Sequence, residues 1–272
     1  MDDSTPFATR YGPVALVAGA AVGLGAAWAD ALAARGLDLV LIDRDAAPLA
    51  RTADAMRAAH RVTIDTATLD LGRPDLLAAL APVVDGRAIG LVVCNAALGT
   101  VAPFLDLAPE HLDAMLAVNC RGPLLLAHAF APGMVARGRG GIVVMSSLSA
   151  NVGSAQLSVY AASKAFDLVF ADALWAELRP HGVDVLAVQP GSTRTPDWLS
   201  SQPADAAGAG VPVMEPAAVV AEALDALGRE PLLVPGEMNR QGAALLAGMP
   251  RRQAILLLSG ITGGLVPNYR RP

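Results

Sequence analysis

The chain has 272 residues, of which 54% are hydrophobic and 17% are charged, so it can form one large domain with a sizeable core. A net charge of −5 gives no reason to expect nucleic-acid binding, which needs a basic stripe. The two cysteines, Cys94 and Cys120, stand in apolar surroundings without metal-ligand spacing, so we expect buried free thiols, no disulfide framework and no metal site.

We expect neither end of the sequence to be an export or membrane segment. Residues 1–13 are polar and lack the apolar run of a secretory signal. The longest late apolar run, Ala254–Val266, is interrupted by Ser and Gly and is too short to span a bilayer. The prediction is a cytoplasmic protein without an integral membrane segment.

Short, continuously apolar runs alternate with longer Ala/Leu-rich segments along the chain. The runs predicted as strands are Val14–Gly19, Leu37–Asp43, Arg61–Ala67, Ile89–Asn95, Gly141–Ser147, Val183–Gly191 and Pro231–Gly236. Strands that are apolar throughout and separated by helices indicate an α/β fold, with a parallel sheet covered on both faces. We therefore predict a single Rossmann-like domain over residues 1–272, with a doubly wound sheet of seven strands. Ligands bind such a sheet beyond the carboxyl ends of its strands.

The first predicted strand runs into the glycine-rich segment AGAAVGLG, which opens directly into a helical pattern. Glycines let the backbone turn tightly beside a pyrophosphate, and the N-terminus of the following helix supplies N–H donors. The spacing of Gly19, Gly23 and Gly25 is weak evidence by itself in a chain with 26 glycines, but the strand–turn–helix context strengthens it. A plain glycine-rich turn is the alternative.

Asp43 ends the second predicted strand, 24 residues after Gly19. A carboxylate there can accept both hydrogen bonds of an adenosine ribose and would repel a 2′-phosphate, which favours NAD. Arg44 follows at once and favours NADP, because a guanidinium pairs well with phosphate. We expect NAD and leave NADP open. Asp70, after the third strand, is either an adenine contact or an ordinary helix N-cap before Pro74.

Tyr160 and Lys164 lie in the strongly helical segment SVYAASKAFDLVFADALWAEL. Positions i and i+4 share one face of a helix, so the phenol and the ammonium lie together. A neighbouring cation favours phenolate and so moves a tyrosine toward proton exchange near neutral pH. Lys164 is the only lysine in a chain that otherwise uses arginine, which does not release its proton. A surface tyrosine beside an unrelated lysine is the alternative.

Two other polar residues precede this pair. Ser147 ends the fifth predicted strand and can present its hydroxyl at the same crevice. Asn119 lies within an apolar helical pattern, where an amide is unfavourable unless it is used. Asn119 is therefore either a buried residue that satisfies nearby backbone or a member of a proton relay.

In their order along the chain, these motifs resemble those of the short-chain dehydrogenase/reductase family, NAD(P)-dependent oxidoreductases built on a single Rossmann-like domain. The resemblance covers roughly residues 13–236. AGAAVGLG stands at the family's cofactor turn, CNAA (Cys94–Ala97) at a segment that stabilises the central sheet, and PGSTRT (Pro190–Thr195) at the segment that holds the nicotinamide. Ala18 and Ala97 depart from the family pattern, which usually has Thr and Gly there.

The resemblance also implies a role for each of four residues, with Ser147 thirteen positions before Tyr160. Tyr160 would be the general acid in carbonyl reduction and the general base in alcohol oxidation. Ser147 would hydrogen-bond the substrate oxygen. Lys164 would favour the phenolate and hydrogen-bond the nicotinamide ribose, and Asn119 would position a water that links Lys164 to solvent.

The implied cofactor site draws on the ends of several strands. Its expected residues are Gly19, Ala21, Gly23, Leu24, Gly25, Asp43, Arg44, Asp70, Leu71, Asn95, Ala96, Tyr160, Lys164, Pro190, Gly191, Thr193 and Thr195.

The loop 192–214 is rich in Gly, Ala, Ser and Pro, and a loop of this length within a compact domain is usually a lid or a binding loop. Trp198, Leu199 and Met214 would make it an apolar cover, so we expect Ser147, Tyr160, Trp198 and Leu199 to contact a hydrophobic ketone or secondary alcohol. A disordered connector is the alternative.

The tail 238–272 suggests two short helices separated at Pro250. It would close the pocket, extend a subunit interface or touch a membrane surface, and packing against the protein is the preferred interpretation.

Two other functions are also compatible with these motifs. One is a sensor that binds NAD(P) without catalysis, which would not need the Tyr–Lys–Ser set. The other is a sugar-nucleotide epimerase or dehydratase, although such chains usually carry a larger substrate domain than the roughly 80 residues that follow Pro190. The family resemblance further implies a small-molecule substrate and a homodimer or homotetramer, built on the two long helices after the fourth and fifth strands.

Overall fold

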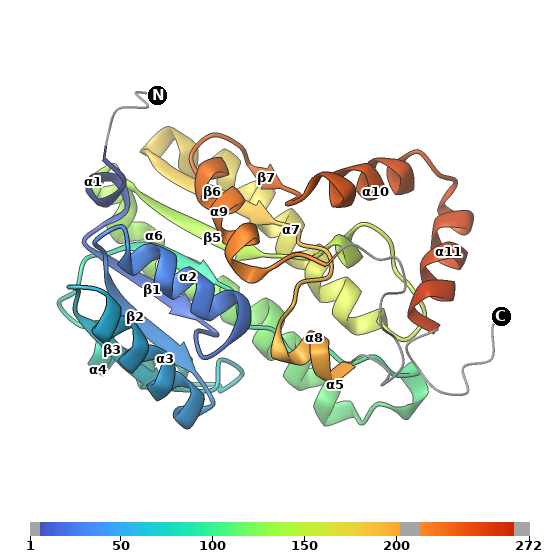
Figure 1. Cartoon of the computed structure of the whole chain (residues 1–272), viewed down its shortest axis with the longest axis horizontal. Coiled ribbons are helices and arrows are strands. Elements are labelled where there is room, and N and C mark those ends of the chain that lie inside the picture. The colour runs from blue at the N-terminus through green and yellow to red at the C-terminus, as the bar shows by residue number, and fades with distance from the viewer. Residues whose placement is uncertain (1–5, 202–212, 264–272) are drawn as a thin grey trace.

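A computed structural model of the chain describes residues 6–201 and 213–263 (Figure 1). Its centre is one parallel sheet of seven strands in the order β3-β2-β1-β4-β5-β6-β7. The strands are β1 (Val14–Ala18), β2 (Asp38–Asp43), β3 (Ile64–Thr68), β4 (Ile89–Cys94), β5 (Gly140–Met145), β6 (Val183–Val188) and β7 (Leu232–Leu233). The predicted α/β class, the parallel sheet and its seven strands are confirmed. The order of the strands reverses between β1 and β4, which is where such sheets bind ligands.

Several strands are shorter than the apolar runs that predicted them. β3 begins at Ile64 rather than Arg61, because only Ile64–Thr68 pairs with β2. β5 ends at Met145 and β6 at Val188, so Ser147 lies beyond its strand rather than at its end. β7 keeps two residues, which pair with Ala187 and Val188 of β6.

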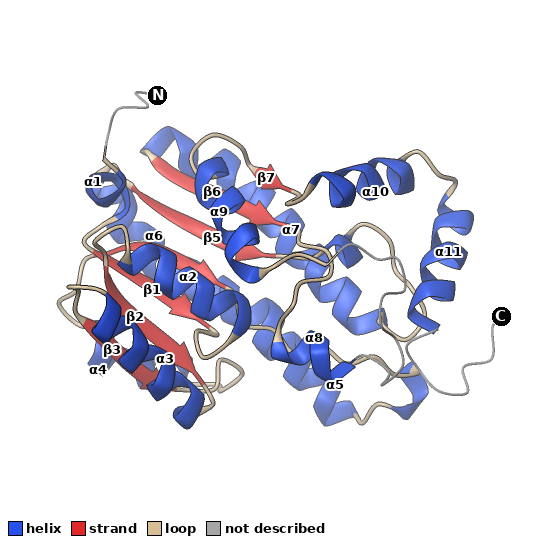
Figure 2. Ribbon diagram, in the orientation of Figure 1, coloured by secondary structure: helices blue, strands red, loops and turns tan. Residues whose placement is uncertain are grey.

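Helices cover both faces of the sheet and give it two hydrophobic cores (Figure 2). On one face lie α2 (Gly23–Ala33), α3 (Ala46–Ala59) and α9 (Pro216–Ala226). On the other lie α4 (Leu76–Val84), α6 (Gly122–Arg137) and α7 (Ser158–Leu178). Successive strand residues point to opposite faces, so Leu16 enters one core and Val17 the other. This explains why the strands read as unbroken apolar runs.

The short helix α1 (Phe7–Tyr11) is tied to the beginning of β6 by a buried carboxylate. Arg10 Nε and Nη2 donate to the two oxygens of Asp184 at 2.6 and 2.7 Å. The Tyr11 hydroxyl donates to Asp184 Oδ2 at 2.7 Å. The cluster therefore closes the end of the sheet at which the strands begin, opposite the end expected to bind ligands.

The remaining helical segments are η1 (Phe104–Asp106), α5 (Pro109–Leu116), the π-helical turn η2 (Ala117–Arg121), η3 (Leu148–Ala150), η4 (Arg179–His181), α8 (Pro196–Ser201), α10 (Glu237–Ala247) and α11 (Arg251–Gly263). Several of them, including α5, α8 and α11, lie near the end of the sheet where the strands finish (Figure 1). Pro250 separates the last two helices, as predicted for the tail.

Among the residues that the structure describes, one helical stretch, Pro109–Arg137, is long and apolar enough by length and composition alone to cross a bilayer. It comprises α5, η2 and α6, and its face with Leu126, Ala127 and Met134 is buried in the core of the protein. A core helix passes the same test, so this finding is weak evidence for a membrane segment.

Candidate active site

The glycine turn follows β1 and packs directly against the segment after β4. Gly19 has φ +79° and Gly23 has φ +58°, a region that favours glycine. A side chain on Gly19 would bring its Cβ to 2.6 Å from the Cα of Ala96, and one on Gly25 would collide with the Gly19 carbonyl oxygen. Asn95 Nδ2 also donates to that oxygen at 2.8 Å. The predicted residues Asn95 and Ala96 thus shape the turn.

The helix α2 begins inside this turn with an open N-terminus. Val22 precedes it without a capping side chain, and its first turn holds no acidic residue. The first N–H groups of a helix lack partners within the helix, and with the helix dipole they favour an anion. The arrangement is the one that a pyrophosphate requires. Leu24 lies in the first turn and packs partly against the core.

Asp43 ends β2 beside the glycine turn. Its Oδ2 accepts the Ala21 N–H at 2.9 Å, and its Oδ1 accepts the Asp45 N–H at 3.1 Å. Arg44 is exposed, and its Nε lies 3.9 Å from Asp45 Oδ2. The position holds two carboxylates close to one exposed guanidinium.

Asp70 lies beyond β3 in a tight turn. Its Oδ1 accepts the Gly72 N–H at 2.7 Å. The interpretation as a helix N-cap before Pro74 is wrong, because α4 begins at Leu76 and Asp75 precedes it. Leu71 is buried in the core under α4 and α6.

The segment after β6 lies against both the glycine turn and α10. A side chain on Gly23 would bring its Cβ to 2.9 Å from the Thr195 methyl group. Thr193 donates to the Gly191 carbonyl at 3.2 Å, and Pro190 accepts the Leu148 N–H at 3.1 Å. The structure thus brings the predicted nicotinamide segment next to the predicted pyrophosphate turn.

Lys164 lies on α7, one turn after Tyr160, with its side chain only 3% exposed. Its Nζ donates to the carbonyl of Met145, at the end of β5, at 2.8 Å, and to Asp167 Oδ2 at 2.9 Å. Burial lowers the pKa of this ammonium, but the charge and hydrogen bond of Asp167, together with Tyr160 and Cys120 nearby, outweigh burial, so the pKa is raised. Ser146 donates to the Lys164 carbonyl at 2.7 Å, which fastens α7 to β5.

Ser147 and Tyr160 come from different elements, the N-cap of η3 and the helix α7, and η3 and α7 pack against each other. Ser147 precedes the 3₁₀ turn η3, and its Oγ accepts the Ser149 N–H at 3.2 Å. A Cβ on Gly99 would lie 3.4 Å from the Tyr160 ring, so the phenol lies against the loop that follows β4.

Asn119 is fully buried in the π-helical turn η2. Its Oδ1 accepts the Leu98 N–H at 2.7 Å, and its Nδ2 donates to the Leu98 carbonyl and to Ser163 Oγ, both at 2.9 Å. Ser163 in turn donates to the Tyr160 carbonyl at 2.8 Å. The amide therefore satisfies nearby backbone and also connects η2 to the first turn of α7. π-helical turns are frequent at functional sites.

The substrate side of the site is described only in part. Trp198 and Leu199 lie on α8, and the Leu199 side chain is 53% exposed. Thr195 Oγ1 accepts the Trp198 N–H at 3.2 Å. Of the predicted loop 192–214, residues 202–212 lie outside the described part of the chain.

The tail helix α11 packs on the loop between Ser147 and Tyr160, in line with the interpretation that the tail packs against the protein. Arg251 donates to the Asn151 carbonyl at 2.9 Å. The Ala155 N–H donates to Ser259 Oγ, and Thr262 Oγ1 donates to the Ala155 carbonyl, both at 3.0 Å. The helix α11 thus holds the loop that connects η3 to α7.

Sequence reasoning missed two buried polar residues, Asp167 and Gln156. Asp167 follows Lys164 by three positions, so helical spacing could have indicated it. Gln156 has φ +68°, which is uncommon for a residue other than glycine. Its side-chain amide is buried and has no hydrogen-bond partner among the residues described. No sequence signal separates Gln156 from an ordinary loop residue.

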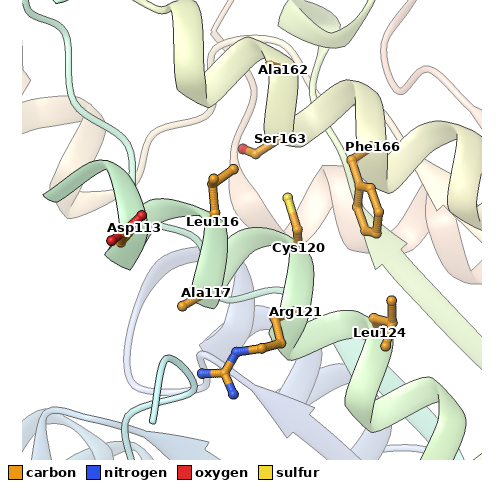
Figure 3. A pocket seen from close by; sticks show the side chains of 9 residues that line it. All are labelled: Asp113, Leu116, Ala117, Cys120, Arg121, Leu124, Ala162, Ser163 and Phe166. Carbon is orange, nitrogen blue, oxygen red and sulfur yellow. The ribbon is translucent and has the colours of Figure 1, made fainter. Parts of the chain in front are cut away.

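A groove of about 600 Å³ lies on the outer side of α5, η2, α6 and α7. Figure 3 shows Leu116, Cys120 and Leu124 on one side of it and Phe166 of α7 on the other. Burial raises the pKa of the Cys120 thiol to about 11, so this cysteine is neutral near pH 7. The groove is mostly apolar and lies beside Ser163.

The chain is similar in sequence to known dehydrogenases and reductases. A family model described as short chain dehydrogenase matches residues 13–205. The chain is 28% identical over 252 residues to a 7beta-hydroxysteroid dehydrogenase of Clostridium sardiniense, covering 93% of this chain and 96% of that protein. A very-long-chain 3-oxoacyl-CoA reductase of Phaeosphaeria nodorum is 32% identical over 184 residues, covering 65% of this chain and 54% of the reductase, so the match spans about half of that relative.

A solved structure, reported for the stereoselectivity of 7beta-hydroxysteroid dehydrogenase, superimposes with a TM-score of 0.88 at 27% identity. The superposition covers 94% of this chain and 100% of the chain in that structure.

Proposed function

The chain belongs to the short-chain dehydrogenase/reductase family, and from that premise we propose that Tyr160 transfers the proton in an NAD(P)-dependent interconversion of a carbonyl and a secondary alcohol. The observation that carries the proposal is the buried Lys164 ammonium one helical turn from Tyr160, beside the end of β5. A structural lysine gains little from such burial, because desolvation of its charge is costly. A non-catalytic sensor or a sugar-nucleotide epimerase is not favoured, since the matched relatives are dehydrogenases and reductases.

The end of β1 fits a dinucleotide on three observations. There is no room for a side chain at Gly19 or Gly25, the N-terminus of α2 is uncapped, and Asp43 stands beside the turn. We propose that the α2 N–H groups hold the pyrophosphate and that Asp43 accepts the ribose hydroxyls. Asp43 and Asp45 together favour NAD over NADP, because a 2′-phosphate would meet two carboxylates and only one exposed arginine.

A nicotinamide cofactor held at the α2 N-terminus and Asp43 would supply the hydride in reduction and accept it in oxidation. In reduction, Tyr160 donates its phenolic proton to the carbonyl oxygen, and in oxidation its phenolate removes the hydroxyl proton. Ser147 donates a hydrogen bond to the same oxygen and stabilises its developing negative charge. Lys164 favours the phenolate by its charge.

Asn119 contributes through its neighbours. Its amide holds Ser163, and Ser163 holds the carbonyl of Tyr160. We propose that Asn119 fixes the start of α7 in this way and, as the family resemblance implies, positions a water that connects Lys164 to solvent.

The proposed substrate is a bulky, hydrophobic ketone or secondary alcohol. The relative with the fuller coverage is a hydroxysteroid dehydrogenase, and the helix α8 offers Trp198 and the half-exposed Leu199. We propose that these two side chains contact the apolar body of the substrate. Activity confined to small charged alcohols would contradict this assignment.

The direct test is Tyr160→Phe. General acid–base catalysis contributes about 10²- to 10⁴-fold, so kcat should fall by about that factor while the cofactor still binds, as measured by nicotinamide absorbance and by titration. Tyr11→Phe is the matched control, because it removes the same hydroxyl at the opposite end of the sheet. It should lower Tm and leave kcat unchanged. Turnover by Tyr160→Phe equal to that of the unmodified protein would refute the proposal.

We further propose that the whole chain works as one catalytic and cofactor-binding domain, in the cytoplasm, as a homodimer or homotetramer. Support for self-association comes from the outer face of α5, α6 and α7, where Leu116, Leu124, Phe166 and Val169 are 46%, 39%, 37% and 65% exposed. Apolar groups gathered on one helix face are typical of a subunit interface.

A further inference from the structure

The Lys164 ammonium has a carboxylate partner on its own helix. Asp167 Oδ2 lies 2.9 Å from Lys164 Nζ, and the two side chains are 1% and 3% exposed. The other oxygen, Asp167 Oδ1, is buried and has no hydrogen-bond partner among the residues described. Among the residues described, Lys164 is therefore the only side chain that hydrogen-bonds to this carboxylate.

Stability is a poor explanation for this pair. Taking two charges out of water costs several kcal/mol for each ion, and the mutual attraction compensates well only when the remaining polar atoms are also bonded. The unbonded Oδ1 does not meet that condition. Ala161 and Ala171 of the same helix are buried apolar side chains, so an apolar residue would suit the position.

The pair has two consequences for Lys164. Two of the three ammonium protons are committed, one to the Met145 carbonyl and one to Asp167, which fixes the direction of the side chain and leaves one donor. The negative charge 2.9 Å away also cancels part of the field that Lys164 exerts on its other neighbours, including Tyr160.

On the function proposed above, we propose that Asp167 is a positioning residue: it holds the Lys164 ammonium and partly neutralises it, and so sets the pH at which Tyr160 exchanges its proton. The effect passes through Lys164, and Asp167 itself need not touch substrate or cofactor.

The other titratable groups facing the pair do not compete in this role. Besides Tyr160 on α7, they are Cys94 at the end of β4 and Cys120 in η2. Burial raises the pKa of the Cys94 thiol well above its usual value and that of the Cys120 thiol to about 11. Both are neutral over the pH range of an assay. The end of β5 contributes an uncharged carbonyl and the Ser146 hydroxyl.

The experiment compares pH profiles of kcat/KM, from pH 5 to 10, for Asp167→Asn and the unmodified protein. Asparagine keeps the shape and removes the charge, so a protonated Lys164 acts on Tyr160 with its full charge and favours the phenolate at lower pH. The rising limb of alcohol oxidation and the falling limb of carbonyl reduction should both move down by about one pH unit. Asp167→Glu, which restores the carboxylate, should return both limbs toward their original positions.

Asp172→Asn is the matched control, because it removes the same charge from an exposed position of the same helix. The limbs of its pH profiles should stay where they are in the unmodified protein. Should Asp167→Asn fail to fold, Asp167→Leu gives the same measurement with an apolar side chain of similar volume. Limbs that stay in place in a folded Asp167 variant, with activity merely lower at every pH, overturn the inference and leave a structural role. Absence of cofactor turnover in the unmodified protein would instead refute the proposed function.

Discussion

At the scale of single residues, Asp43 is the side chain through which cofactor choice can be tested most directly. Its two oxygens already accept the N–H groups of Ala21 and Asp45, so the carboxylate is held in place before any ligand binds. A group fixed in this way loses little conformational freedom on binding.

Asp43→Ala should therefore change the preference between the two cofactors. The variant loses the proposed acceptor for the ribose hydroxyls and the proposed repulsion of a 2′-phosphate, while Arg44 remains. We expect kcat/KM for NAD to fall about tenfold or more, which corresponds to one charged hydrogen bond of roughly 1.5–3 kcal/mol. The value for NADP should stay constant or rise. Initial rates with both cofactors check this, and a parallel fall with both would contradict the role assigned to Asp43.

The sequence made some of these residues easy to predict and others impossible. Tyr160 and Lys164 could be predicted as a pair, because i, i+4 spacing places them on one helix face whatever the tertiary structure is. Ser147 was placed at a strand end and lies two residues beyond it, because its hydroxyl accepts a bond from the following 3₁₀ turn. Gln156 could not be predicted, since only tertiary packing determines that its amide is buried, whereas the i, i+3 spacing from Lys164 is a signal by which Asp167 could have been found.

At the scale of elements, the docking of α11 on the loop 151–157 is the arrangement with the clearest effect on the site. The contacts come from Ser259 and Thr262 to one residue, Ala155, and from Arg251 to Asn151. This loop joins η3, which follows Ser147, to α7, which carries Tyr160, so on the proposed function its position affects the space between these two residues.

Removing the two bonds to Ala155 should loosen this loop. In the double variant Ser259→Ala/Thr262→Val, two hydrogen bonds of about 0.5–1.5 kcal/mol each are lost. We expect KM for a bulky ketone to rise several-fold, with the cofactor Kd unchanged, as measured by steady-state kinetics and titration. Gln253→Ala, at an exposed position of the same helix, is the control. An unchanged KM with a lower Tm would reduce α11 to a structural element.

At the scale of the whole molecule, the alternation of apolar runs and helical patterns was sufficient to predict the parallel sheet. It was not sufficient for β7, which keeps two residues, or for the direction in which the tail helices pack. Edge strands and tails depend on a few tertiary contacts, such as Asn239 against Gly191, and these leave no periodic pattern in the sequence.

The self-association proposed for the face of α5, α6 and α7 belongs to this scale. Val169→Asp places a charge on this apolar surface, at a residue that is 65% exposed in a single copy of the chain. Burying that charge would cost several kcal/mol, so the variant should elute as a smaller species in size-exclusion chromatography with light scattering. Leu105→Asp, at a 91% exposed residue outside this face, should leave the mass unchanged. A monomeric unmodified protein would contradict the proposal.

The attachment of α11 also bears on the protein while it is being synthesised. The glycine turn, Tyr160 and Lys164 all lie before Thr195, whereas the residues that hold the loop 151–157 begin at Arg251. The core on the α2 face includes Val219, Val220 and Ala223 of α9, so a nascent chain can complete that face only after α9 has been synthesised. The loop 151–157 acquires its contacts with α11 later still.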